Sequence, residues 1–152
     1  MSLRIFSVGC LALAAMLDVD SSQLKTSLTY KEHSDFVRLS EFFNGLENTG
    51  QRLIVRSQSD SRSGLYFSLS LNVLEIPERA TVHLDIVRNS SPEPHSFKMV
   101  LPQSSLTARE LLVGLTGKDW SGPEERPVAW HLQLLDGEGE VFASEKSFLW
   151  EK

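Results

Sequence analysis

The chain has a single cysteine, Cys10, so no disulfide can form within its 152 residues. It also lacks a positive charge balance, because 15 lysines and arginines stand against 20 aspartates and glutamates. Nucleic-acid-binding domains need a basic surface to neutralise phosphates, so the formal net charge of -5 predicts no nucleic-acid partner. The same acidity disfavours anionic lipid headgroups. Proteins and neutral ligands are the partners that this composition favours.

A long hydrophobic run is also missing. The apolar segment from Ile5 to Leu17 is shorter than the roughly 20 residues that a membrane-spanning helix needs. It follows one basic residue, Arg4, and contains the small-residue sequence Ala12-Leu13-Ala14, which is the outline of a signal peptide. Residues 1–17 are therefore predicted to be a signal peptide and 18–152 a single domain with no stable membrane span after signal removal.

Export to the periplasm, the cell envelope or the medium follows from that prediction. Two alternatives stay open. Cys10, after Val8 and Gly9, has a neighbourhood that resembles a lipidation signal. If residues 1–17 instead belong to the folded domain, the protein is cytoplasmic.

Catalytic motifs are lacking as well. There is no G-x-S-x-G nucleophile motif, and Gly117-Lys118 has Leu112 and Asp119 where a phosphate-binding loop requires Gly and Ser or Thr. Ser22 and Lys25 match S-x-x-K without the partner motifs of that enzyme class. The chain is therefore predicted not to be an enzyme, and an enzyme with an unrecognised site is kept as an alternative.

Metal ligands are sparse. The four histidines are not spaced for ligation on a helix, and the best pair is His83 with Asp85 on one face of a predicted strand. Two ligands fall short of the four that structural zinc requires, so no metal and no other cofactor is predicted.

The sequence is rich in alternating apolar residues. The clearest strand covers residues 65–73, and its expected dry face consists of Leu65, Phe67, Leu69, Leu71 and Val73. Its other face consists of Tyr66, Ser68, Ser70 and Asn72. Strict alternation is typical of a strand with one dry and one wet face.

Similar runs occur at residues 52–56, 81–86, 96–101 and 128–134. A return strand is expected over 141–150, with a bulge near Lys146 where the apolar residues change parity. About seven to eight half-dry strands without long helices predict an all-β, antiparallel two-sheet Greek-key sandwich. The predicted core contains Leu65, Phe67, Leu69, Leu71, Leu84, Ile86, Phe97, Val128, Trp130 and Leu132.

Residues 34–45 are ambiguous. Phe36, Leu39 and Phe43 recur at helical spacing, with Ser34 as a candidate N-cap and Gly45 as a stop, which favours one short helix. A strand pair around Asn44-Gly45 is the alternative.

The last hairpin runs from Val128-Ala129-Trp130 through Asp136-Gly137 to Phe148-Leu149-Trp150, with Leu115 ahead of it. It resembles the closing strands of fibronectin-III-like and immunoglobulin-like domains of bacterial exported proteins. The chain departs from their pattern, since no tyrosine lies near Trp130 and no cysteine pair flanks a tryptophan. The resemblance implies the sandwich architecture.

Three aromatic residues are candidate binding residues: Trp120, Trp150 and Tyr66. Trp120 lies in a Gly- and Pro-rich loop, where it either plugs the end of the sandwich or forms a binding platform. The favoured function is a non-enzymatic exported module that binds proteins or has a structural role in the cell envelope. A carbohydrate-binding module, with Trp120 and Tyr66 stacking on a glycan, is the alternative.

Overall fold

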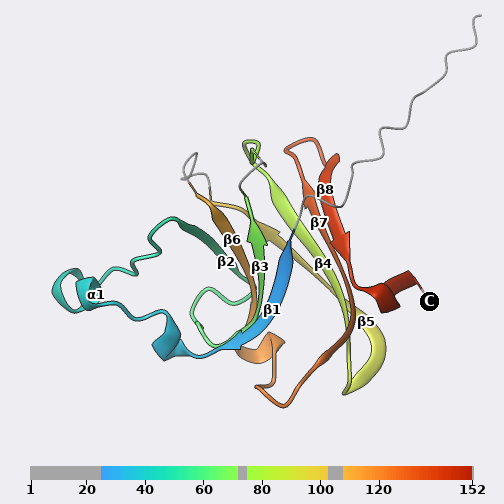
Figure 1. Ribbon diagram of the computed structural model, residues 1–152, viewed down its shortest axis with the longest axis horizontal. Helices are drawn as coiled ribbons and strands as arrows, with labels where there is room; N and C mark the ends of the chain where they lie inside the picture. The colour runs from blue at the N-terminus through green and yellow to red at the C-terminus, as the bar shows by residue number, and fades with distance from the viewer. Residues whose placement is uncertain (1–24, 72–74, 103–107, 152) are drawn as a thin grey trace, which may run out of the picture.

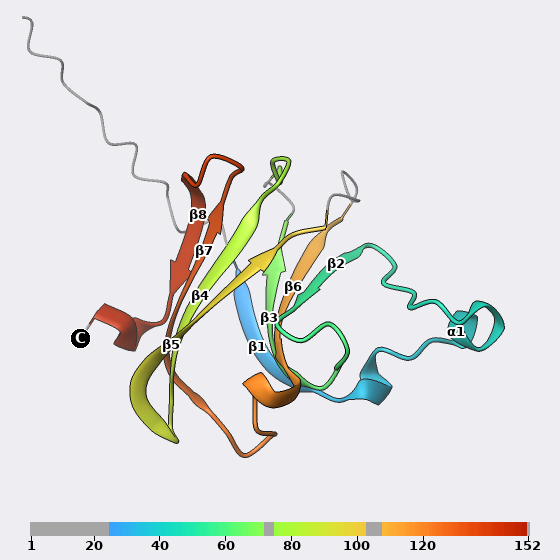
Figure 2. The same ribbon diagram turned by 180° about the vertical axis from the view of Figure 1, so that it is seen from behind.

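The protein is a sandwich of two four-stranded sheets (Figures 1 and 2). The structure is a computed structural model, and it describes residues 25–71, 75–102 and 108–151. The first sheet has the order β1-β3-β6-β2, with β1 at Thr26–Lys31, β3 at Gly64–Ser70, β6 at Glu110–Thr116 and β2 at Arg52–Arg56. The second has the order β5-β4-β7-β8, with β5 at Ser91–Val100, β4 at Thr81–Arg88, β7 at Pro127–Leu135 and β8 at Val141–Lys146. The predicted all-β, two-sheet architecture is confirmed.

The connections cross between the sheets. The chain leaves the first sheet after β3, forms the β4–β5 hairpin in the second sheet, and returns to place β6 beside β3. The predicted signal peptide, its cleavage region and Cys10 lie outside the described residues.

One strand pair differs from the antiparallel expectation, because β2 runs parallel to β6. Since β1 and β6 both pair antiparallel with β3, β1 and β2 point in the same direction. Two strands that share a direction need a long crossover between them. Residues 32–51 are that crossover, and they contain the 3-10 turn η2 at His33–Asp35 and the helix α1 at Leu39–Asn44.

The core fills the space between the sheets. Eight of the predicted core residues are at most 9% exposed: Leu65, Phe67, Leu69, Leu71, Leu84, Ile86, Trp130 and Leu132. Phe67 and Trp130 meet edge to face across the core, with ring centroids 5.3 Å apart. The alternation of period two therefore identified the dry faces of β3, β4 and β7.

Two predicted core residues differ. Val128 is 45% exposed because β7 has a register shift there: Ala129 pairs with Val87 and Pro127 with Arg88, which leaves Val128 out of the ladder. Such a bulge turns the extra side chain away from the face of its neighbours. Phe97 is only partly buried, since it lies on β5 at the edge of its sheet.

The last strand is shorter than expected. β8 ends at Lys146, and Phe148–Glu151 form the 3-10 turn η4. The change of parity in this segment therefore comes from the end of the strand, and the bulge predicted near Lys146 is wrong. A register shift does occur earlier, where Leu134 pairs with Ala143 and Leu135 with Val141.

The short helix near residues 34–45 is present, with a later start than the sequence indicated. Ser34 lies within η2, and α1 begins after Arg38. Phe36, between the two, is 1% exposed, so the chain bends there to bury this ring. Gly45 ends the helix with a φ of 69°, the left-handed conformation that favours glycine. Among the described residues, no helix has the length and apolar character needed to cross a membrane.

Candidate functional site

Tyr66 does not lie on a solvent-exposed face, contrary to the strand pattern. Its side chain is 1% exposed and packs with Phe36 and Leu112 in a second, smaller core on the outer side of the first sheet. Its hydroxyl donates to the carbonyl of Arg62 and accepts from Nε of Arg56, both at 2.7 Å. Burial raises the pKa of this phenol. A ring covered in this way offers no platform for a glycan.

Trp120 is buried too, at 3% exposure, and is part of the main core. It follows the 3-10 turn η3 at Gly117–Asp119, which brings the ring back over the end of the sandwich. The guanidinium of Arg88 lies over the ring, 5.2 Å from its centroid. Its position agrees with the plug, and leaves no open aromatic face for a binding platform.

Trp150 is half-buried and lies in η4. Its ring packs on His131 of β7, with centroids 5.7 Å apart and planes inclined by 33°. Burial lowers the pKa of His131, Asp85 acts in the opposite direction, and Lys146 lowers it further. Of the three predicted binding residues, Trp150 alone keeps substantial exposure. The three are at separate places in the fold and do not form one site.

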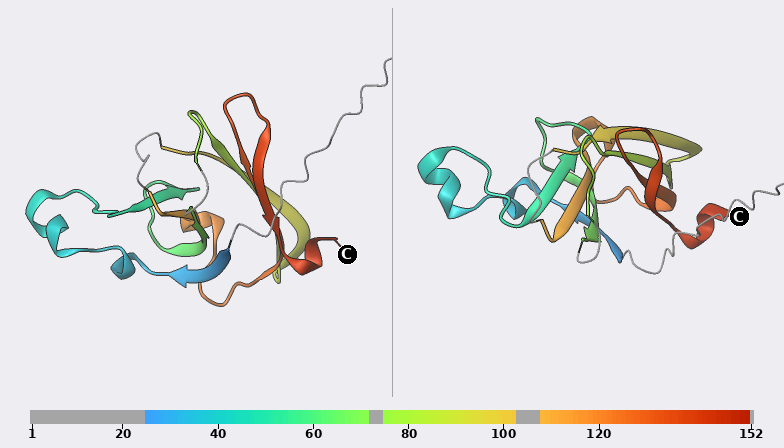
Figure 3. Two further views of the ribbon diagram at one scale, coloured as in Figure 1. Left: turned by 45° about the horizontal axis from the view of Figure 1, so that its top comes forward. Right: turned by 90° about the horizontal axis from the view of Figure 1, so that it is seen from above.

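Exposed apolar side chains gather instead on the crossover between β1 and β2. Leu39, Phe42, Phe43 and Leu46 are between 70% and 89% exposed, and we refer to these four residues as the apolar lobe. Figures 1 and 3 show that α1 projects from the side of the sandwich, beyond the rest of the described chain. A group of large exposed apolar residues marks an interaction site in a soluble protein.

The four residues of the apolar lobe follow the spacing i, i+3, i+4 and i+7. On a helix this spacing places side chains on one face. α1 ends at Asn44, before Gly45. Leu39, Phe42 and Phe43 therefore lie on α1 itself, and Leu46 adds a fourth exposed apolar side chain directly after it.

Two carboxylates of the crossover are turned back toward the sandwich. Glu41 accepts a hydrogen bond from Arg62 at 2.9 Å, and Glu47 accepts two from Arg56 at 2.7 and 2.8 Å. Their side chains are only 12% and 20% exposed. The pKa of Glu47 is lowered, chiefly by the hydrogen bonds from Arg56. Because Glu41 is the one charged residue between Leu39 and Leu46, the outward side of the apolar lobe carries no exposed charge.

Arg56, which binds Glu47, also contacts the second core. Arg56 lies on β2, its guanidinium is 4.9 Å from the ring centroid of Phe36, and its Nε donates to Tyr66. Phe36 and Tyr66 lie with ring centroids 4.9 Å apart. The crossover is therefore held at its start by an aromatic contact and at its end by a bidentate ion pair.

The helical spacing of Phe36, Leu39, Phe43 and Leu46 was visible in the sequence, where it predicted one short helix and no binding site. The sequence feature that could have indicated a binding site is a run of apolar residues on a helix of only six residues, which is too short to pack across a sheet. The sequence could not reveal which of these residues the sheet covers. Only Phe36 reaches it.

A metal site is not formed in the part of the chain that the structure describes, where no group of three histidine, cysteine or acidic side chains comes together. His83 and Asp85 lie two residues apart on β4, as the strand pattern predicted. Asp85 accepts a hydrogen bond from Ser96, and His83 lies between Lys98 and Gln133 of the neighbouring strands. The pair is therefore part of a polar sheet face.

Comparison with known proteins gives no match to a protein-family model, a curated protein or a solved structure. The resemblance of the last hairpin to fibronectin-III-like and immunoglobulin-like domains therefore stays a prediction.

Proposed function

We propose that this protein is a non-enzymatic, exported interaction module that docks its apolar lobe into an apolar groove of a partner protein. The observation that carries the proposal is the exposure of Leu39, Phe42, Phe43 and Leu46 on one projecting segment (Figure 1). This is the anchor spacing of helices that bind in hydrophobic grooves. Burying one such side chain contributes about 1.5–3 kcal/mol, so four anchors supply a substantial gross gain before the cost of association.

The shape and charge of the lobe favour a groove over the other occupants. The lobe is convex, so two copies meeting tip to tip would leave the flanks of both lobes in water. A groove surrounds them. An anionic membrane is disfavoured because the chain carries a net charge of -5.

The lobe is also held in place before it binds. Arg56 and Arg62 fix Glu47 and Glu41, so the apolar side chains are presented without the cost of ordering a free loop. Export itself rests on residues 1–17 and is part of the proposal.

The proposal is tested by placing a photo-crosslinking amino acid at position 43, in cells that make the protein. The matched control carries the same group at Val141, which is 43% exposed on β8, at the opposite side of the molecule. We expect one adduct from position 43 that is missing from position 141. Mass spectrometry should map the linked residue of the partner to an apolar groove.

The same adduct should be lost when Leu46→Ser is added, because one of the four anchors is then gone. Equal adducts from positions 43 and 141 would refute docking through the lobe. So would an adduct between two copies of the chain, or co-sedimentation with liposomes that depends on Phe42 and Phe43.

A further inference from the structure

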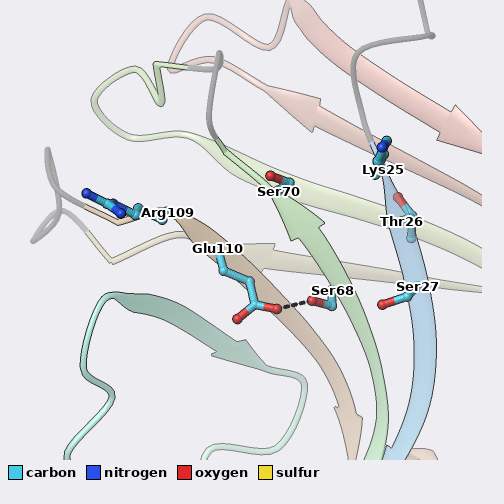
Figure 4. Close-up of a pocket in the computed structure, with 7 residues that line it drawn as sticks. All are labelled: Lys25, Thr26, Ser27, Ser68, Ser70, Arg109 and Glu110. Atoms are coloured by element: carbon cyan, nitrogen blue, oxygen red, sulfur yellow. Dashed lines mark hydrogen bonds between the residues drawn. The ribbon is translucent and has the colours of Figure 1, made fainter.

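The outer face of the first sheet carries a polar hollow that is separate from the apolar lobe (Figure 4). Its volume is about 250 Å³, and Ser27, Ser68, Ser70 and Glu110 line it together with Lys25 and Arg109. Thr26 also borders the hollow, but its hydroxyl donates to Glu145 of β8. The lining thus consists of four residues with hydroxyl groups, two cationic residues and one carboxylate.

Strand register explains why these side chains come together. Ser27 of β1 is directly opposite Ser68 of β3, and Ser70 follows two residues later on the same face. Glu110 of β6 is opposite Ser70. Residues that are paired or two apart share a sheet face, so three adjacent strands supply the hollow.

The crossover leaves this part of the face open. Leu112, which is opposite Ser68, is covered by Phe36 together with Tyr66. The covering stops there, since the next residues along β3 and β6, Ser70 and Glu110, are only partly buried. The hollow is therefore the uncovered half of a face whose other half is a small core.

The carboxylate of Glu110 determines the charge of ligand that fits. Ser68 donates a hydrogen bond to Oε1 of Glu110, which keeps the carboxylate beside the serines of the hollow (Figure 4). Among the described residues, Oε2 of Glu110 has no hydrogen bond. In Figure 4 the guanidinium of Arg109 points away from Ser70, so it does not form an anion cradle with Lys25. An anionic ligand bound against Ser68 and Ser70 would lie beside the carboxylate of Glu110, and the two like charges would repel each other.

We propose that the hollow binds a neutral monosaccharide unit. A sugar hydroxyl donates to Oε2 of Glu110, and the serine hydroxyls, which both donate and accept, exchange hydrogen bonds with its other hydroxyls. The volume is below the range of about 300–1,000 Å³ of drug-sized pockets, which limits the ligand to one ring. This glycan site does not use the aromatic residues that the sequence suggested, and it is independent of docking through the apolar lobe.

The test is a titration of the isotope-labelled protein with glucose, galactose and N-acetylglucosamine, followed by amide chemical shifts, with glucuronate as the anionic comparison. We expect at least one neutral sugar to bind with a Kd in the millimolar range and to shift the amides of Ser27, Ser68, Ser70 and Glu110. Glu110→Gln should weaken that sugar about tenfold or more, because a hydrogen bond to a charged acceptor is lost. Ser144→Ala, a partly exposed serine on β8 of the other sheet, is the control and should leave the affinity unchanged.

The mapping on the unmodified protein needs no variant, so it stands even if Glu110→Gln fails to fold. Shifts confined to another surface would overturn the proposal, and so would tighter binding of glucuronate than of every neutral sugar. An absence of shifts with all four compounds would overturn it as well.

Discussion

The carboxylate of Glu47 accepts two hydrogen bonds from the guanidinium of Arg56, at 2.7 and 2.8 Å. Glu47 lies at the end of the lobe-bearing crossover, and Arg56 lies on β2 with its guanidinium over Phe36. One ion pair thus connects the projecting segment to the sheet and to the small core beneath it.

This relationship makes the crossover sensitive to acid. The pKa of Glu47 is lowered from about 4.5 in the folded protein, so its contribution is complete above that value and is lost as the pH falls through the folded pKa. We expect hydrogen-exchange protection of residues 38–50 to decrease below about pH 4.5, after correction for intrinsic exchange. Glu47→Gln should show low protection already at pH 7. Glu138→Gln, in an exposed turn, is the control, and identical profiles for all three proteins would contradict the role of the pair.

Phe36 and Phe43 belong to the same segment and should respond in opposite ways to truncation. Phe36 is 1% exposed and Phe43 is 89% exposed. Phe36→Ala should lower the free energy of unfolding by about 3–5 kcal/mol, as a buried aromatic does. Phe43→Ala should change it by under about 0.5 kcal/mol. Urea unfolding of both variants measures this, and a large loss for Phe43→Ala would mean that the lobe is packed.

Trp120 should behave as a core residue. Trp120→Ala is expected to cost about 3–5 kcal/mol, because its buried ring fills the end of the sandwich. Its Nε1 is buried without a hydrogen-bond partner among the described residues, so Trp120→Phe removes an unsatisfied donor and should cost less than alanine. Thermal unfolding distinguishes the variants. An unchanged melting temperature for Trp120→Ala would show that the ring is not a plug.

Gly114 should not accept a side chain while Tyr66 is present. A Cβ at position 114 would lie 2.5 Å from Cε1 of Tyr66, closer than two carbons approach without a shift. Gly114→Ala should therefore destabilise the protein by about 1–3 kcal/mol. In a Tyr66→Ala background the same substitution should cost much less, since the atoms it meets are gone. A double-mutant cycle from urea unfolding measures the difference, and full additivity would exclude the contact.

Trp150 should control the titration of His131. Burial lowers the pKa of His131, and the Trp150 ring packs on it. Trp150→Ala should expose the imidazole and raise its pKa toward the ordinary value of about 6.5. Nuclear magnetic resonance titration of the histidine side chains reports this directly. The change should be confined to His131, and an unaltered His131 curve would show that Trp150 does not shield it.

The alternation along β3, β4 and β7 was enough to predict two sheets and most of the core, because in a strand the side-chain direction reverses at every residue. Leu65, Phe67 and Leu69 are buried as a result of that local geometry. The turn after Leu135 and the helix stop at Gly45 were also visible, since both depend on the conformational preferences of a few neighbouring residues.

The tertiary structure decided which faces are covered. Tyr66 and Ser70 have the same parity on β3, yet Tyr66 is buried and Ser70 borders an open hollow, because Phe36 from a distant segment reaches only the first. In the same way, the apolar lobe is exposed because the parallel placement of β2 requires a crossover, and α1 in this crossover projects from the side of the sandwich (Figure 1). Periodicity is set by the local backbone and can be predicted from the sequence. Coverage depends on contacts between residues far apart in the chain, which the sequence alone does not bring together.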